Sequence, residues 1–314
     1  MKKVVLAFDS FKGCISAREA CEACAQGVCE AWQDAVIVQI PLSDGGEGLV
    51  ECVRRMLPTR SVTVEVHGPL MDRVEAEYAI SADGKTAYME MAAASGLTLV
   101  PQERRNPMTA TTYGVGEMIA DAVKRGCQTI VMGIGGSATC DGGRGMIEAL
   151  GDCRCLDMDC RVIVACDVNN PLFGKNGAAY VFAPQKGATP EQVELLDGRL
   201  RAFAKETEQA GRATPELALS PGAGAAGGLG YALLAYLNAE LHSGIDIMLD
   251  IADFDAVIKD ADLVITGEGK SDGQTLMGKV PHGVLKRCQE ANVPVWLLSG
   301  MVDDATGRLA ENFD

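Results

Sequence analysis

The amino-acid sequence predicts an α/β protein of two domains, one built on a parallel sheet and the other a mixed α/β domain inserted into it. Near both ends of the chain, short apolar runs alternate with loops and amphipathic helices, which is the pattern of a parallel sheet covered by helices. Residues 61–91 instead alternate apolar and polar side chains with period two, as antiparallel strands do. The length of 314 residues suits two domains.

The first segment follows the parallel pattern. Ser16 is expected to cap a helix, because Glu19 stands three residues later and completes a capping box. Loops with glycine and acidic residues follow the strands. The expected strands are Val4–Phe8 and Val36–Ile40, and the expected helices run from Ser16 to about Trp32 and from Leu49 to Leu57.

The inserted domain is expected to begin near Val62. Asp83-Gly84 between two alternating runs predicts a hairpin. Thr189 with Pro190 behind it predicts the start of a long charged helix, and a glycine-rich turn from Pro221 leads into an apolar helix. The other expected elements are helices at Thr111–Arg125 and Arg144–Leu150 and strands at Thr129–Met132, Arg161–Ala165 and 181–184.

The parallel pattern returns near Asp262. Leu263–Thr266 and Val293–Leu298 are expected strands, joined by a long loop and a helix from about His282 to Ala291. The simplest topology makes residues 1–61 and 262–314 one discontinuous domain of the Rossmann or flavodoxin type, with residues 62–261 as the insertion.

The composition limits the possible partners. A formal net charge of −15 and the lack of a basic cluster argue against a nucleic-acid partner. No apolar stretch approaches the ~20 residues that cross a bilayer, and the start "MKKVVLAFDSFKG" lacks the apolar run of a signal peptide. We therefore expect a cytoplasmic enzyme without a membrane partner, in which an anionic substrate is held by local donors.

The twelve cysteines do not form a zinc pattern. Cys21 and Cys24 make one C-x-x-C pair without a matching second pair, and Cys153, Cys155 and Cys160 form a separate group. Free cysteine also behaves as a small buried apolar residue. We expect the cysteines to fill space.

The stretch "IVMGIGGSATCDGGRGM" places a glycine-rich loop, Gly133–Gly143, between a strand and a helix. Exposed amides and the helix dipole favour an anion there, although a tight packing turn fits the same residues. Two standard nucleotide-binding motifs are matched only in part. Gly222–Gly227 matches G-x-G-x-x-G without a strand before it, and Gly269-Lys270-Ser271 has Val264 where a P-loop needs glycine.

Carboxylates follow several of the predicted strands. A single acidic loop residue is usually a helix cap or a turn former. Loops at the carboxyl ends of parallel strands meet at one edge of the sheet, however, where ligands of such folds bind. With nearby lysines, these are the parts that phosphoryl transfer requires. The residues are Asp9, Asp44, Glu47, Asp141, Asp167, Glu268 and Asp272.

These loops together resemble the bacterial glycerate kinase type-1 family, the glycerate 2-kinases. The matching segments occur in family order over nearly the whole chain: "DSFKG", "SDGGEG", "MEMAAASGL", "GIGGSATCDGG", "ACDVNNPL", "PQKGAT", "PGAGAAGGLG", "SGIDI" and "TGEGKSDGQTLMGKVP". The resemblance implies two α/β domains, one inserted in the other, with a cleft between them. It also implies ATP- and Mg²⁺-dependent phosphorylation of D-glycerate, 2-phosphoglycerate being the favoured product.

The sequence also departs from the family. Cys140 stands where asparagine is usual, and Lys270-Ser271 where arginine and an apolar residue are common. The bridge at residues 151–160 is shorter than in most members, and the chain ends at Asp314, before the closing elements that members usually have.

Candidate roles follow from loop position and charge. Asp272 is the first candidate for the carboxylate at the reacting hydroxyl, Asp44 the second, and Lys12 a candidate for the phosphoryl or glycerate carboxylate charge. Asp141 either binds Mg²⁺ or caps the following helix. The expected nucleotide-binding residues are Gly133, Gly135, Gly136, Ser137, Thr139 and Lys186, and the expected substrate-binding residues are Asp9, Glu47, Lys270 and Lys279. A sugar-acid-binding protein that is non-catalytic or of different specificity is the alternative.

Overall fold

The computed structural model describes residues 2–11, 13–43, 48–151, 160–273, 275–276, 278–304 and 307–313. The chain divides into two compact units: unit 1 is Met1–Leu57 with Ser243–Asp314, and unit 2 is Pro58–His242. Unit 2 is therefore inserted between two segments of unit 1. Both boundaries differ from the expected ones. Residues 59–61 already belong to the first strand of unit 2, and residues 243–261 contain two helices that pack on the rest of unit 1.

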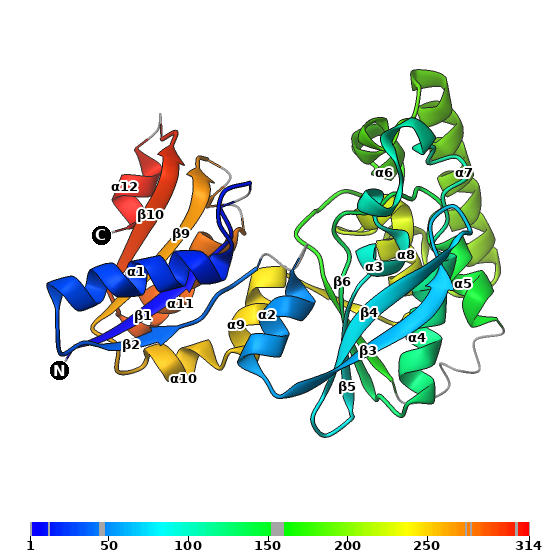
Figure 1. The fold of residues 1–314 in the computed structure, drawn as a ribbon. Coiled ribbons are helices and arrows are strands. Elements are labelled where there is room, and N and C mark those ends of the chain that lie inside the picture. Colours follow the sequence, from blue (N-terminus) through cyan, green and yellow to red (C-terminus); the bar gives the residue numbers. More distant parts are fainter. Residues whose placement is uncertain are drawn as a thin grey trace. The chain divides into compact units, whose positions relative to one another are not determined.

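Unit 1 is built on a four-stranded, wholly parallel sheet in the order β10-β9-β1-β2. Strands from the two ends of the chain pair directly, with Val4 opposite Leu263, so that the blue β1 and the orange β9 lie side by side in Figure 1. The strands are β1 (Lys3–Phe8), β2 (Val36–Gln39), β9 (Leu263–Ser271) and β10 (Val295–Val302). The helices are α1 (Ala17–Ala31), α2 (Leu49–Met56), α9 (Gly244–Ile251), α10 (Phe254–Ile258), α11 (Val280–Ala291) and α12 (Arg308–Asn312).

Local sequence signals position the helices of unit 1. The predicted capping box of α1 is confirmed: the Ser16 hydroxyl accepts from the Glu19 amide, and the Glu19 carboxylate accepts from the Ser16 amide. Helix α11 is joined to α9 and α10 by Arg287, whose guanidinium donates to Asp250 at 2.7 Å and to Asp255 at 2.6 Å. These contacts explain why α9 and α10 belong to unit 1.

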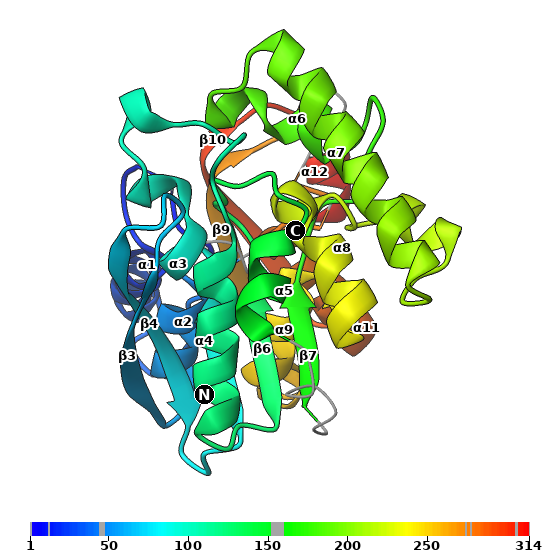
Figure 2. The same cartoon turned by 90° about the vertical axis from the view of Figure 1, so that its right-hand side faces the viewer.

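Unit 2 is built on a six-stranded mixed sheet in the order β3-β4-β5-β6-β7-β8. The first three strands are antiparallel and the last four run parallel. Helices α4, α5 and α8 lie next to one another in Figure 2 and share one apolar core with the strands. The strands are β3 (Thr59–His67), β4 (Arg73–Ser81), β5 (Thr86–Glu90), β6 (Thr129–Gly133), β7 (Arg161–Ala165) and β8 (Glu240–His242). The helices are α3 (Ala92–Ser95), α4 (Tyr113–Lys124), α5 (Arg144–Leu150), α6 (Ala178–Phe182), α7 (Pro190–Gln209) and α8 (Ala225–Leu237).

Several turn and cap predictions in unit 2 are confirmed. Gly84 has a φ of +75° in the turn between β4 and β5. Thr189 caps α7 through a complete capping box with Gln192, and Pro190 is in the first turn. The residues before Gly222 form a short 3₁₀ helix, Pro215–Leu219. The prediction that no strand precedes this glycine-rich turn, which argued against a dinucleotide motif, is also confirmed.

Two local predictions were wrong. Residues 181–184 are not a strand, because Val181 and Phe182 end α6 and Pro184 opens a 3₁₀ turn, Pro184–Lys186. Residues 267–271 are not a loop, because β9 continues to Ser271 alongside β10. The extension of β9 over residues 267–271 was not predicted, because glycine and charged residues are uncommon in strands. No helix in the described ranges is both long and apolar enough to cross a membrane.

Candidate active site

The glycine-rich loop of unit 2 leaves β6 at Gly133 and enters α5 at Arg144. Gly136 has a φ of +70°, which side-chain-bearing residues rarely adopt, and its carbonyl accepts from the Leu97 amide at 2.8 Å. Among the described residues, no protein acceptor takes the amides of Gly135, Gly136 or Ser137. Three successive amides are thus available to an anion.

Lys186 lies against this loop. Its ammonium group donates to the Ser137 hydroxyl at 2.6 Å and to the Thr139 carbonyl at 2.7 Å. The residue is 2% exposed, and burial lowers the pKa of its ammonium group to about 8. No carboxylate within the described ranges forms an ion pair with it. Asp141 acts on it only through space, in the direction that raises its pKa. A buried ammonium whose hydrogen-bond acceptors are all neutral favours a bound anion.

The glycine-rich turn before α8 supports the loop by close packing. Ala226, Gly227 and Gly228 all have left-handed backbone angles. A side chain on Gly227 would place its Cβ 2.0 Å from the Thr139 carbonyl oxygen. The Thr139 hydroxyl is buried and has no hydrogen-bond partner in the described part of the chain. The glycines thus let two backbone segments meet, which is their structural role here.

Asp141 is engaged as a cap. Its carboxylate accepts from the Thr112 amide and hydroxyl at 2.9 and 2.8 Å, and from the amides of Gly143 and Gly145 at 3.1 and 3.2 Å. These contacts tie the start of α5 to the start of α4. Of the two roles expected for Asp141, the geometry matches capping, because four donors already surround the two oxygens that a metal ion would need.

Unit 1 has a pocket of about 410 Å³ at the carboxyl ends of β1, β9 and β10. Asp9 and Glu268 bring carboxylates to it and are 6% and 5% exposed. Lys270 and Lys279 bring ammonium groups. The structure therefore gathers three of the four expected substrate residues, Asp9, Lys270 and Lys279, around one cavity.

Asp272 lies just after β9. Its carboxylate is 3.4 Å from the ammonium group of Lys270, which is also 3.3 Å from Asp303. The hydrogen bonds to Asp303 and Asp272 raise the pKa of Lys270 above its ordinary value. The expected catalytic carboxylate is thus held beside one of the pocket lysines. Lys12, Asp44 and Glu47, the other candidates of unit 1, lie outside the described residues.

Comparison with known proteins identifies the family. The model of the Glycerate kinase family matches residues 4–163 and 153–314. The chain belongs to the glycerate kinase family. It is therefore an enzyme of the kinase class, and its membership supports glycerate phosphorylation. The two matched segments overlap at residues 153–163, around the short bridge of which residues 152–159 lie outside the described ranges.

Relatives and a solved structure agree with this assignment. The chain is 44% identical to a glycerate kinase of Bacillus subtilis, over 96% of this chain and 85% of the relative. It is 43% identical to the glycerate 2-kinase of Escherichia coli, over 97% and 87%. The crystal structure of a putative glycerate kinase 2 from Salmonella typhimurium has a TM-score of 0.86 at 42% identity, covering 99% of this chain and 94% of that one. The predicted α/β fold is confirmed.

The positions that depart from the glycerate kinase pattern have partners in this chain. Cys140 is buried in an apolar cluster with Leu172 and Leu200, and burial raises the pKa of its thiol to about 11. Ser271 exchanges a hydrogen bond of 2.6 Å with Ser299 on β10. The substitutions therefore fit their local surroundings.

Glu268 is one of the loop carboxylates expected from the sequence, and it has no predicted role. In the structure its carboxylate accepts from the hydroxyls of Thr275 at 2.5 Å and Ser271 at 3.1 Å, and it lies 3.4 Å from the Lys279 ammonium. The signal that could have found it is the spacing of hydroxyls and lysine after it in "GEGKSDGQTLMGK". Its burial could not be read from the sequence, because the residues around it were expected to form an open loop.

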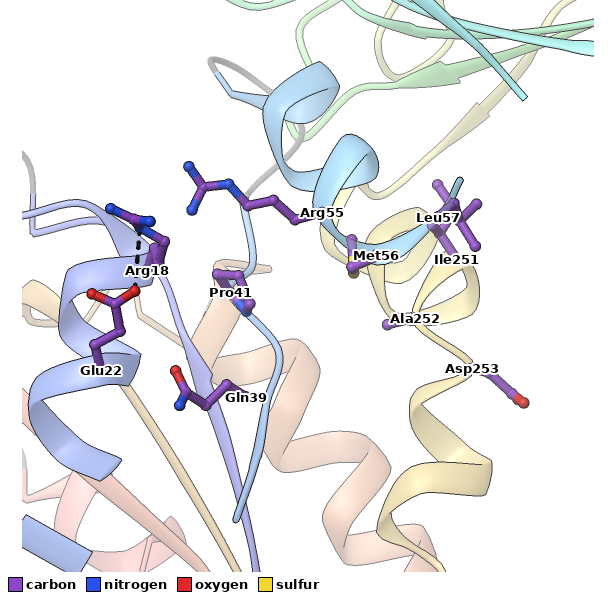
Figure 3. A pocket seen from close by; sticks show the side chains of 10 residues that line it. All are labelled: Arg18, Glu22, Gln39, Pro41, Arg55, Met56, Leu57, Ile251, Ala252 and Asp253. Carbon is purple, nitrogen blue, oxygen red and sulfur yellow. Dashed lines mark ion pairs between the residues drawn. The ribbon is translucent and has the colours of Figure 1, made fainter. Parts of the chain in front are cut away.

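A second cavity of unit 1, of about 650 Å³, is larger than the pocket at the strand ends and holds none of the expected site residues (Figure 3). Its arginines have local partners: Arg18 is 3.5 Å from Glu22, and Arg55 contacts Glu51. The expected residues Asp9, Lys270 and Lys279 line the smaller pocket instead.

The described cysteines are free thiols, and five of them are buried: Cys21, Cys52, Cys127, Cys140 and Cys288. Burial raises the pKa of Cys21 to about 12, which keeps its thiol protonated. Within the described ranges, no three histidine, cysteine or acidic side chains are grouped as metal ligands. Cys153 and Cys155 lie outside those ranges.

Proposed function

We propose that this enzyme transfers the γ-phosphoryl group of ATP to D-glycerate and that the product is 2-phosphoglycerate. Membership of the glycerate kinase family supports the reaction class. The 43% identity to a relative named glycerate 2-kinase supports the choice of hydroxyl.

The observation that carries the nucleotide part of this proposal is the buried ammonium group of Lys186. Its two acceptors are neutral oxygens, so a phosphate oxygen would supply the anion that the buried charge favours. The amides of the neighbouring loop and the unpartnered Thr139 hydroxyl add donors. The proposed phosphate-binding set is Gly133, Gly135, Gly136, Ser137, Thr139 and Lys186.

The pocket of unit 1 is the proposed site of the acid. Glycerate has one carboxylate and two hydroxyls, and a pocket with two lysines and two carboxylates offers partners for all of them. Lys270 and Lys279 are the proposed partners of the substrate carboxylate, and Asp9 of a hydroxyl. Asp272 is the proposed group that takes or orients the proton of the reacting hydroxyl. Asp44 and Lys12 are the further proposed catalytic residues, and Glu47 a further substrate contact.

Mg²⁺ is proposed to enter with the nucleotide, because phosphate oxygens and water are the ligands that it prefers. The four donors around the Asp141 carboxylate do not fit a bound cation. We therefore assign Asp141 to capping and derive no step from a metal at that residue.

An ADP-release assay with D-glycerate, other sugar acids and no acceptor tests the proposal. We expect turnover that requires D-glycerate and added Mg²⁺. The product is identified with enolase alone, which consumes 2-phosphoglycerate directly and needs a mutase for 3-phosphoglycerate. ADP release that is indifferent to D-glycerate would contradict the assigned substrate, and a signal only with the mutase would contradict the assigned hydroxyl.

A further inference from the structure

Glu268 lies at the pocket of unit 1, outside the set of residues to which a role has been given. We propose that Glu268 is a positioning residue, which fixes the segment carrying Asp272 and orients the Lys279 ammonium group at the pocket. The inference rests on the proposed function. It concerns a carboxylate that acts through two neighbours rather than on the reacting atoms.

One oxygen of Glu268 leads to Asp272 through Thr275. Oε1 accepts from the Thr275 hydroxyl at 2.5 Å, and the Thr275 oxygen accepts from the Asp272 amide at 2.9 Å. Because the hydroxyl has a single proton, donating it to Glu268 leaves its lone pairs for the amide. The chain of donors therefore fixes the backbone at the residue proposed to meet the reacting hydroxyl.

The same oxygen also orients a hydroxyl that contacts β10. Oε1 also accepts from the Ser271 hydroxyl at 3.1 Å, and Ser271 is 2.6 Å from Ser299 on β10. With the Ser271 proton directed at Glu268, the Ser299 hydroxyl is the donor of that second bond. The carboxylate thus fixes the direction of the Ser271 hydroxyl, which in turn accepts from Ser299 on the neighbouring strand.

The other oxygen of Glu268 faces the start of α11. Oε2 is 3.4 Å from the ammonium group of Lys279, the residue before the first turn of that helix. Lys279 is a third exposed, whereas Glu268 is almost fully buried. The carboxylate therefore limits where the ammonium group can point while leaving part of it open to a ligand.

The two links can be broken separately. Glu268→Gln keeps an oxygen for Thr275 and Ser271 but presents an amide donor to the Lys279 ammonium. Thr275→Val keeps the shape of the side chain and removes the link to Asp272, and Thr275→Ser restores the hydroxyl. A general loss of structure would not separate these effects.

Steady-state kinetics with D-glycerate at saturating ATP provide the test. For Glu268→Gln we expect KM for glycerate to rise about 10-fold with kcat within about 3-fold, because uniform substrate binding is lost. For Thr275→Val we expect kcat to fall at least ~10-fold with little change in KM, because small misplacement of a catalytic group slows the chemical step. Thr275→Ser is expected within about 3-fold of the wild type.

A double mutant checks that Glu268 acts through Lys279. In a Lys279→Met background, Glu268→Gln is expected to add less than about 2-fold to the change in KM, because the interaction is already absent. A full additional 10-fold loss would overturn the positioning role for Lys279. Folded variants of Glu268 and Thr275 with wild-type kcat and KM would overturn the whole proposal. The same kinetic change in both variants, with kcat lowered and KM raised alike, would also overturn it.

A measurement without substrate separates this inference from the proposed function. Amide hydrogen exchange of the peptide carrying Asp272 is expected to be at least ~10-fold faster in Thr275→Val than in the wild type, because local opening is easier. A peptide of β1 is the internal control. If the wild-type enzyme does not turn over D-glycerate, the proposed function is contradicted, and the exchange measurement alone then tests the role of Glu268. An unchanged exchange rate of the Asp272 peptide in Thr275→Val would overturn that role.

Discussion

The glycine-rich loop of unit 2 and the pocket of unit 1 present different kinds of chemical group to a ligand. The loop offers backbone amides, a left-handed glycine and one buried lysine. The pocket offers side-chain charges of both signs at the ends of β1 and β9 and the start of α11. A backbone site is sensitive to the shape of a substituted residue, and a side-chain site is sensitive to its charge. Substitutions at the two places should therefore have different consequences.

Asp272→Asn should cause the largest loss. It keeps the shape of the side chain and removes the carboxylate that is proposed to meet the reacting hydroxyl. Because general acid–base groups contribute about 10²- to 10⁴-fold, we expect kcat with D-glycerate to fall at least ~100-fold while the protein stays folded. Circular dichroism and steady-state assays check both points.

Asp303→Asn is the matched control for Asp272, since both carboxylates contact Lys270. Asp303 is largely exposed and not in the proposed catalytic set, so we expect kcat within about 2-fold of the wild type. Near-normal kcat in Asp272→Asn, or an equal loss in both variants, would remove Asp272 from the catalytic role.

Gly136→Val tests the backbone site. A β-branched residue strains a backbone with φ of +70° and should thereby displace the neighbouring loop amides. We expect ATP binding to weaken at least ~10-fold, which is about 1.4 kcal/mol, while D-glycerate binding changes less. Calorimetric titration of each ligand measures both constants.

Ser137→Ala is the milder companion of Gly136→Val. It removes one hydroxyl that accepts from Lys186 and leaves the loop amides in place, so the loss in ATP binding should be about 0.5–1.5 kcal/mol. If Gly136→Val instead binds ATP normally and loses glycerate, the loop holds the acid, and the assignment of the two units is reversed.

The charge of Lys186 should make ATP binding depend on pH. Its pKa is lowered to about 8, so the ammonium form dominates below that pH and is lost above it. An anion binds the charged form better, so the Kd for ATP should rise as pH increases through about 8, by at most ~10-fold per pH unit. Calorimetry between pH 7 and 9.5 measures the slope.

Lys186→Met should weaken ATP binding and abolish this slope. Lys205→Met, which removes an exposed lysine from α7, is the control and should keep it. A wild-type Kd that is flat over this range, or a slope that persists in Lys186→Met, would show that the buried ammonium does not meet the phosphates.

The smallest effect is expected from Cys21→Ala with Cys24→Ala. Both thiols have pKa values raised by burial, and Cys21 packs in the core of unit 1. Activity should be unchanged and indifferent to zinc chelators, with a stability loss of about 1 kcal/mol from the lost volume. Stoichiometric zinc in the purified wild type that is absent from the variant would contradict the space-filling role.

Much of the fold could be predicted because its signals are local. The capping boxes at Ser16 and Thr189, the turn at Gly84 and the apolar run of β1 each lie within a few residues of sequence. The end of β9 could not be predicted. Its glycines and charged residues are strand-like only because β10 pairs beside them, and that partner is more than twenty residues away in sequence.

The candidate site also has features that local sequence predicts and others that depend on distant parts of the chain. The glycine content after β6 and the acidic residues at strand ends were visible in the sequence, and they located Gly136, Asp9 and Asp272. The choice between capping and metal binding for Asp141 was open, because it depends on Thr112, 29 residues away. Glu268 received no role because its burial depends on how the chain folds around it, where Thr275 and Ser271 donate to its carboxylate.

The family, the α/β class and the segments of the candidate site can thus be recognised without a structure, because motifs, caps and apolar periodicity depend on residues that are neighbours in the chain. Which charges are buried, and what they contact, depends on the folded chain. Lys186 is the clearest case: in the sequence it is a loop lysine, and folding brings it to Ser137 and removes it from water. The energy of a charge depends on its surroundings, and distant parts of the chain supply them.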